Sequence, residues 1–168
     1  MTVVLGLDLG QNVGWFKGGA VGPCTFGTFR MKNTTDLGLW LRGSDEFFRE
    51  VLVGVDAVAI EQPFFSRDYY AVRKLISLVG YACMWSSTMG IPAARIAEIP
   101  VPTAKLTLAG SGRAEKSDMI AAAADRGYPG LNEHESDAFA VWTVSVFGKR
   151  EPIAKRRTTN GKPVRVAP

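Results

Sequence analysis

The stretch TVVLGLDLGQNVG, residues 2–14, decides the fold. Its first seven residues form an almost continuous apolar run that ends in the carboxylate of Asp8, which is typical of a strand buried on both faces. The glycines that follow turn the chain, and further short strands are expected over residues 14–17 and 25–31. These three strands predict a β-meander at the start of the chain.

Helices and strands alternate after the meander. Apolar residues recur at helical spacing over residues 35–52, which predicts an amphipathic helix weakened by Gly38 and Gly43. A second buried strand, residues 55–61, also ends in a carboxylate, Glu61. The other predicted elements are a strand at 94–99 and helices at 67–89, 103–108, 114–126 and 133–147. This order predicts an α/β domain with a mixed central sheet flanked by α-helices.

Composition limits the class of protein. The chain has 168 residues, of which 46% are apolar and 21% charged, as expected for one globular domain with a core of its own. Two cysteines are too few for a disulfide framework or a zinc cluster, and they favour a reducing, cytoplasmic location. The longest apolar stretch, near residues 75–85, is too short to span a membrane. The first residues read as a strand and lack the basic segment of a secretory signal, so we expect none to be cleaved there.

The positive charge is concentrated at the end of the chain. The net charge is +4, yet residues 149–168 carry seven basic residues and one acid, so residues 1–148 carry a net charge of −2. We therefore expect a folded domain over 1–148 and a basic, flexible tail over 149–168 that contacts a polyanion. A solubilising tail is an equally good interpretation of the charge alone.

Four separated side chains form a candidate metal site. Asp8 and Glu61 each end an apolar strand, and a buried carboxylate is costly unless it is paired or binds a cation. His134 and Asp137 are three residues apart on the last predicted helix, so they point to nearly the same side. Oxygen-rich ligands with one nitrogen favour Mg²⁺ or Mn²⁺ over zinc. Taken singly, each residue also has a purely structural interpretation as a turn, strand-end or helix-start group.

The motifs LGLDLGQNVGW, AIEQPFF, KLTLAGSGRAEKSD and HESDAFAVW occur in this order and span about residues 3–146. They resemble the RuvC family of Holliday junction resolvases, which have the RNase H-like fold. The resemblance implies metal-binding roles for Asp8, Glu61 and Asp137. His134 stands where many members have Asp, and an imidazole there can ligate a metal or orient water.

The same resemblance implies the cofactors and the DNA contacts. It implies two Mg²⁺ or Mn²⁺ ions per active site and no small-molecule cofactor. Lys105 and Lys116 match the basic residues near the scissile phosphate, and Phe64 matches an aromatic that stacks on bases at the junction centre. The full set of residues expected to contact DNA is Phe64, Phe65, Arg67, Lys105, Arg113, Lys116, Lys155, Arg156 and Arg157.

The implied protein is a crossover junction endodeoxyribonuclease. We expect it to act as a homodimer, because a four-way junction has two symmetry-related strands to cut. Paired symmetric nicks with 5′-phosphate ends are expected, on four-way junctions and also on forks. The short chain suits a phage-type member acting in the cytoplasm of a bacterium or an infected host.

Three alternatives remain from the sequence. An RNase H-like nuclease that cuts RNA or an RNA–DNA hybrid uses the same metal site. A branched-DNA-binding module with little catalysis would follow if His134 impaired metal binding. The segment DLGQNVG after a strand also resembles the phosphate loop of the sugar kinase and actin superfamily, although those proteins need two such domains and this chain supplies one.

Overall fold

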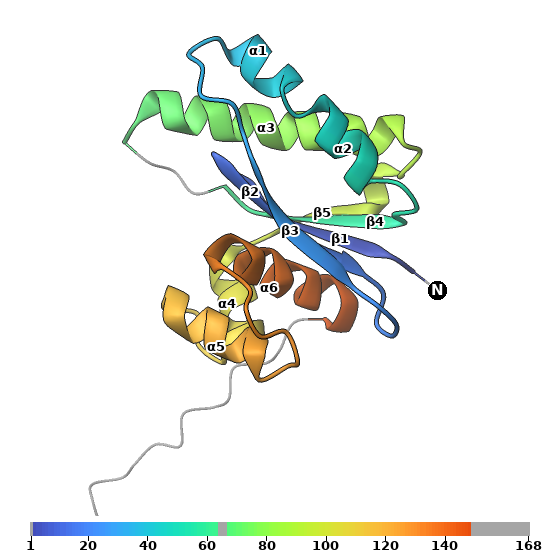
Figure 1. Cartoon of the computed structure of the whole chain (residues 1–168), viewed down its shortest axis with the longest axis vertical. Coiled ribbons are helices and arrows are strands. Elements are labelled where there is room, and N and C mark those ends of the chain that lie inside the picture. The colour runs from blue at the N-terminus through green and yellow to red at the C-terminus, as the bar shows by residue number, and fades with distance from the viewer. Residues whose placement is uncertain (1, 64–66, 149–168) are drawn as a thin grey trace, which may run out of the picture.

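One five-stranded mixed sheet forms the middle layer of the computed structural model, which describes residues 2–63 and 67–148 (Figure 1). The strand order is β3-β2-β1-β4-β5. The β1–β2 and β2–β3 pairs are antiparallel and form the predicted meander, while β1–β4 and β4–β5 are parallel. The strands are β1 (Val4–Asp8), β2 (Asn12–Gly18), β3 (Thr25–Arg30), β4 (Ala57–Glu61) and β5 (Ile96–Ile99).

Helices cover both faces of the sheet (Figure 1). On one face lie α1 (Leu37–Arg42), α2 (Asp45–Val51) and α3 (Tyr69–Thr88), which share a core around Trp40, Phe48 and Leu78. On the other face lie α4 (Val101–Ala109), α5 (Lys116–Ala124) and α6 (Glu133–Phe147), with a second core that contains Phe139 and Trp142. A short 3₁₀ turn, Ala93–Arg95, precedes β5. The predicted fold class is confirmed.

The single helix predicted over residues 35–52 is wrong. The structure has two helices there, with Gly43 closing α1 and Ser44 preceding α2. Ser44 is fully buried, and its hydroxyl donates to the carbonyl of Leu41 at 2.6 Å. The break bends the chain so that Trp40 and Phe48, from different helices, both face the core.

Two glycines let α6 lie directly on the sheet. A Cβ at Gly6 would stand 2.4 Å from the carbonyl oxygen of Ala138, and one at Gly14 would stand 2.1 Å from that of His134. Real side chains do not approach backbone this closely, so only glycine fits at these two positions. Because Gly14 pairs with Asp8 across β1 and β2, this contact brings the first turn of α6 next to Asp8.

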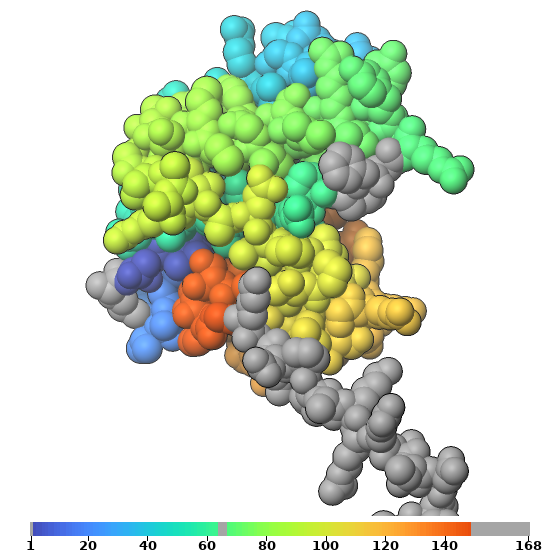
Figure 2. Space-filling model, turned by 180° about the vertical axis from the view of Figure 1, so that it is seen from behind, coloured from blue at the N-terminus to red at the C-terminus, as the bar shows by residue number. Residues whose placement is uncertain are grey.

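The far side of the molecule is covered by α3, α4 and α5, with the C-terminal part of α6 reaching the surface beside α4 (Figure 2). Within residues 2–63 and 67–148, no helix is long and apolar enough to cross a membrane. The predicted tail over 149–168 lies outside the described residues, so the domain boundary at residue 148 stays a prediction.

Candidate active site

Asp8 and Glu61 end neighbouring parallel strands. In the register of β1 and β4, Leu7 pairs with Ile60, and the two acids follow at the next position of each strand. Parallel neighbours end at the same edge of a sheet, which is where ligands bind in many α/β proteins. From the sequence alone, the adjacency of these two strands is an assumption. The structure places them side by side.

The start of α6 brings His134 and Asp137 to the same edge. Asn132 caps the helix, and its side chain and that of Glu135 form a reciprocal capping box. Thr28 on β3 accepts a hydrogen bond from Asn132 at 2.9 Å and donates one to Glu135 at 3.1 Å. The first turn of α6 is therefore tied to the sheet by side chains as well as by the close contact at Gly14.

Burial and like charge raise the pKa values of two of the acids. Burial, then the charges of Asp8 and Asp137, raise the pKa of Glu61 to about 8. Burial, then the charge of Asp8, raise the pKa of Asp137 to about 6. The positive charge of Lys105 opposes both shifts, so this lysine also lies close to the cluster. Ionising all three acids together is costly unless a positive charge joins them.

His134 is held at both ring nitrogens. Its Nδ1 lies 3.0 Å from Oδ2 of Asp8, and its Nε2 lies 3.2 Å from the side-chain nitrogen of Asn12. The hydrogen bond to Asp8 raises the pKa of the imidazole, and the charge of Glu133, whose Oε1 is 3.5 Å from Nε2, adds to the effect. The ring is 27% exposed, so it stands at the mouth of the cluster.

Two lysines supply the positive charge around the acids. Lys105 on α4 donates to the carbonyl of Ala114 at 2.8 Å, which fixes its ammonium group. Lys116, at the start of α5, is exposed and forms an ion pair with Glu133. The hydrogen bond in this pair raises the pKa of Lys116 and lowers that of Glu133. Both lysines predicted to act at the phosphate thus lie beside the acids.

The donor set suits a hard divalent cation. Three carboxyls and one imidazole offer oxygen-rich ligands of the kind that Mg²⁺ and Mn²⁺ prefer. As these side chains stand, no group of three or more His, Cys, Asp or Glu residues within 2–63 and 67–148 has the arrangement of a metal site. The imidazole of His134 is hydrogen-bonded to Asp8 instead. Binding an ion among these residues would therefore require their side chains to change position.

The structure describes only two of the other residues that are predicted to contact DNA. Arg67 precedes α3 and Arg113 lies in the loop between α4 and α5, and both are exposed. The remaining five, Phe64, Phe65, Lys155, Arg156 and Arg157, lie outside the described residues.

Similarity to solved structures decides which fold this is. No family model and no curated protein matches the chain. The chain is similar to the Thermus thermophilus RuvC structure, at 22% identity and a TM-score of 0.69, over 90% of this chain and 100% of that one. The chain has the RuvC fold. A second structure, T. thermophilus RuvC in complex with Holliday junction substrate, matches at 24% identity and a TM-score of 0.71, covering 88% and 94%.

At these identities the similarity to RuvC establishes the fold alone, and the resemblance of the motifs is confirmed to that extent. Sequence reasoning missed Asn12, the partner of His134, because nothing local links positions that are 122 residues apart. It also missed the close contact at Gly14. A glycine inside a strand is a general signal for a close backbone approach, so that contact could have been anticipated.

Proposed function

We propose that this chain is a divalent-metal-dependent endonuclease that cuts four-way DNA junctions by paired symmetric nicks. The observation that carries the proposal is the meeting of Asp8, Glu61, His134 and Asp137 at one sheet edge, beside Lys105, in a chain with the RuvC fold. A structure with the same fold has been solved with a Holliday junction substrate, which supports branched DNA as the substrate class.

Asp8, Glu61 and Asp137 would hold Mg²⁺ or Mn²⁺, with His134 as a further ligand or as the group that orients water. Bound divalent ions lower the pKa of water and neutralise charge on a phosphate. Because burial makes ionisation of Glu61 and Asp137 costly, these acids release their protons most easily when a cation compensates the charge. The acids would therefore bind cations more tightly as pH rises from about 6 to 8.

The lysines would stabilise the phosphate. Lys105 is anchored by the carbonyl of Ala114, so its charge is already directed at the cluster before DNA arrives. Lys116 is exposed and paired with Glu133, and an exposed pair contributes little to stability. Lys116 can therefore leave Glu133 for a DNA phosphate at small cost. In this mechanism Glu133 keeps the lysine near the site until substrate binds.

A second copy of the chain would supply the second cut. One monomer carries one cluster, and a two-fold dimer would present two. Helix α3 is the proposed interface, because it leaves large apolar side chains in contact with solvent, among them Ile76 at 49% and Met84 at 47% exposed. The basic tail would add phosphate contacts whose contribution falls as salt rises.

The test is cleavage of a panel of synthetic nucleic acids with Mg²⁺ or Mn²⁺. The panel contains a four-way DNA junction, a fork, a linear duplex and an RNA–DNA hybrid, each labelled on every strand in turn. We expect symmetric nicks in opposite strands of the junction, and none with Asp8→Asn. The matched control is Asp125→Asn, which changes an exposed acid outside the cluster and should cut normally.

Each of the other outcomes would contradict the proposal and point to a different function. Preferential cutting of the hybrid would show an RNA nuclease. Tight binding of the junction with no cutting under either metal would show a binding module. Cutting that Asp8→Asn leaves intact would show that the cluster is not the active site.

A further inference from the structure

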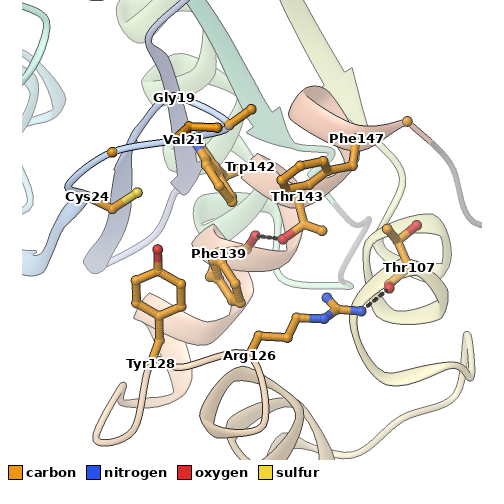
Figure 3. A pocket seen from close by; sticks show the side chains of 13 residues that line it. Gly19, Val21, Cys24, Thr107, Arg126, Tyr128, Phe139, Trp142, Thr143 and Phe147 are labelled. Atoms are coloured by element: carbon orange, nitrogen blue, oxygen red, sulfur yellow. Dashed lines mark hydrogen bonds between the residues drawn. The ribbon is translucent and has the colours of Figure 1, made fainter.

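A hollow of about 590 Å³ lies at the C-terminal end of α6, at the opposite end of that helix from His134 and Asp137. The side chains of Phe139, Trp142 and Phe147 form one wall (Figure 3). The loop that follows β2, including Val21, forms another wall. None of the candidate active-site residues lines this hollow, so the hollow is separate from that site.

The walls are largely aromatic, with the Tyr128 hydroxyl and the Cys24 thiol among their polar groups, and Arg126 is the one charged side chain among the described lining residues. The indole N–H of Trp142 donates to the carbonyl of Gly18 at 3.0 Å, so the indole's only polar group already has its partner. The guanidinium of Arg126 donates to the carbonyl of Thr107 at 2.9 Å, which directs its charge along the rim (Figure 3). Aromatic rings beside an arginine suit an apolar group that carries a neighbouring carboxylate.

The chain itself continues from the rim of this hollow. Gly148 is the last described residue, lines the hollow and has φ +81°, a conformation that glycine adopts without strain. The sequence that follows is KREPIAK, residues 149–155. Glu151 is the only acid after Gly148, and Pro152 and Ile153 are the first large apolar residues. Five residues span at most about 17 Å, so Ile153 can reach the aromatic wall.

We propose that residues 151–154 dock in this hollow, with Pro152 and Ile153 against the aromatic wall and Glu151 opposite Arg126. The tether between Gly148 and this segment is short, which raises its effective concentration to the millimolar range. Even a weak intrinsic affinity then keeps the site occupied. Docking fixes the point from which Lys155, Arg156 and Arg157 leave the domain. The proposal does not depend on which nucleic acid the chain binds.

NMR of the full chain tests the docking directly. The δ1 methyl group of Ile153, assigned with Ile153→Val, should be displaced from its random-coil shift by the ring currents of the aromatic wall. In Ile153→Asp, the indole N–H of Trp142 and the backbone amides of Val21 and Phe147 should shift. Val164→Asp makes a similar exchange of a β-branched apolar residue for an acid eleven residues further on, and it should leave these signals in place.

A charge reversal tests the pairing of Glu151. Glu151→Lys should reproduce much of the Ile153→Asp spectrum, and Glu151→Arg combined with Arg126→Glu should restore the original signals. A random-coil shift for the Ile153 methyl would overturn the proposal, as would pocket signals that Ile153→Asp leaves unmoved. Pocket signals that depend on protein concentration would overturn it too, because they would assign the hollow to a second copy of the chain.

Discussion

The two ends of helix α6 lie in opposite environments: the first turn is among charged side chains and the last turns are among aromatic rings. Its first turn presents His134 and Asp137 to two strand-end carboxyls, and burial and repulsion there raise the pKa values of Glu61 and Asp137. Its last turns present Phe139, Trp142 and Phe147, whose rings contact one another or neighbouring aromatics. Apolar burial at the second end stabilises the helix, while the first end carries an electrostatic cost. The apolar contacts at the end of α6 therefore help to offset the electrostatic cost of placing the acids together at its start.

Asp8→Asn should have the largest effect on activity. The substitution removes a charge that acts on Glu61, Asp137 and His134 alike, so we expect junction cleavage to fall by about 10³-fold or more. Ser145→Ala, an exposed change near the other end of α6, should cut at the normal rate. Initial rates of nicking at saturating DNA measure both. Equal losses in the two variants would remove the functional distinction between the ends.

Glu61→Gln should stabilise the metal-free protein at alkaline pH. The unfolded chain loses the Glu61 proton near pH 4.5, whereas the folded state keeps it until about pH 8, so stability falls as pH rises between these values. The substitution abolishes this loss and should add about 2–4 kcal/mol at pH 8. Melting temperatures from pH 4 to 9 in EDTA measure the effect, and parallel curves for the two proteins would contradict it.

Gly14→Ala should push the first turn of α6 away from the sheet. Its Cβ would meet the backbone of His134, and such overpacking costs about 1–3 kcal/mol. Gly6→Ala makes a similar clash at Ala138, nearer the middle of the helix. Denaturant unfolding should show comparable destabilisation in both, but nicking should fall further for Gly14→Ala. Ser145→Ala, an exposed change on α6 itself, should leave the free energy of unfolding unchanged or raise it slightly.

Asn12→Ala should have the smallest of these effects, about a tenfold loss of nicking, because it frees the orientation of the His134 ring. His134 is the single histidine of the chain, so its imidazole ¹⁵N signals need no assignment. We expect these signals to report a changed tautomer balance in Asn12→Ala.

Thr28→Ala is the matched control for Asn12→Ala. It removes another tie between the sheet and the start of α6 without touching the imidazole. It should leave the ¹⁵N signals of His134 unmoved. If both variants perturb the ring equally, Asn12 acts through the backbone rather than on the imidazole.

The sequence predicts the elements that carry the acids. A long apolar run that ends in a carboxylate is a strong strand signal, and it is correct for both β1 and β4. The helical spacing of residues 133–147 predicts α6 with the observed bounds. These features are local, so periodicity and end signals suffice to find them.

The contacts between distant elements cannot be predicted from local sequence patterns. The position of Asn12 against His134 depends on how α6 lies across β2, which the two glycines and the Thr28 contacts determine. The break at Ser44 is similar, since helical spacing continues through it and only the packing of Trp40 and Phe48 requires a bend. Tertiary packing determines both the Asn12–His134 contact and the break at Ser44, and neither can be predicted from a single sequence.

The parallel pairing of β1 with β4, and the docking of α6 across β1 and β2, have a consequence during synthesis. Position 8 leaves the ribosome early, position 61 later, and position 137 near the end, so a growing polypeptide holds at most part of the cluster. Contacts so far apart along the chain form late in folding. A product that stops before position 137 would therefore lack part of the cluster, and under the proposed function it would not cut DNA.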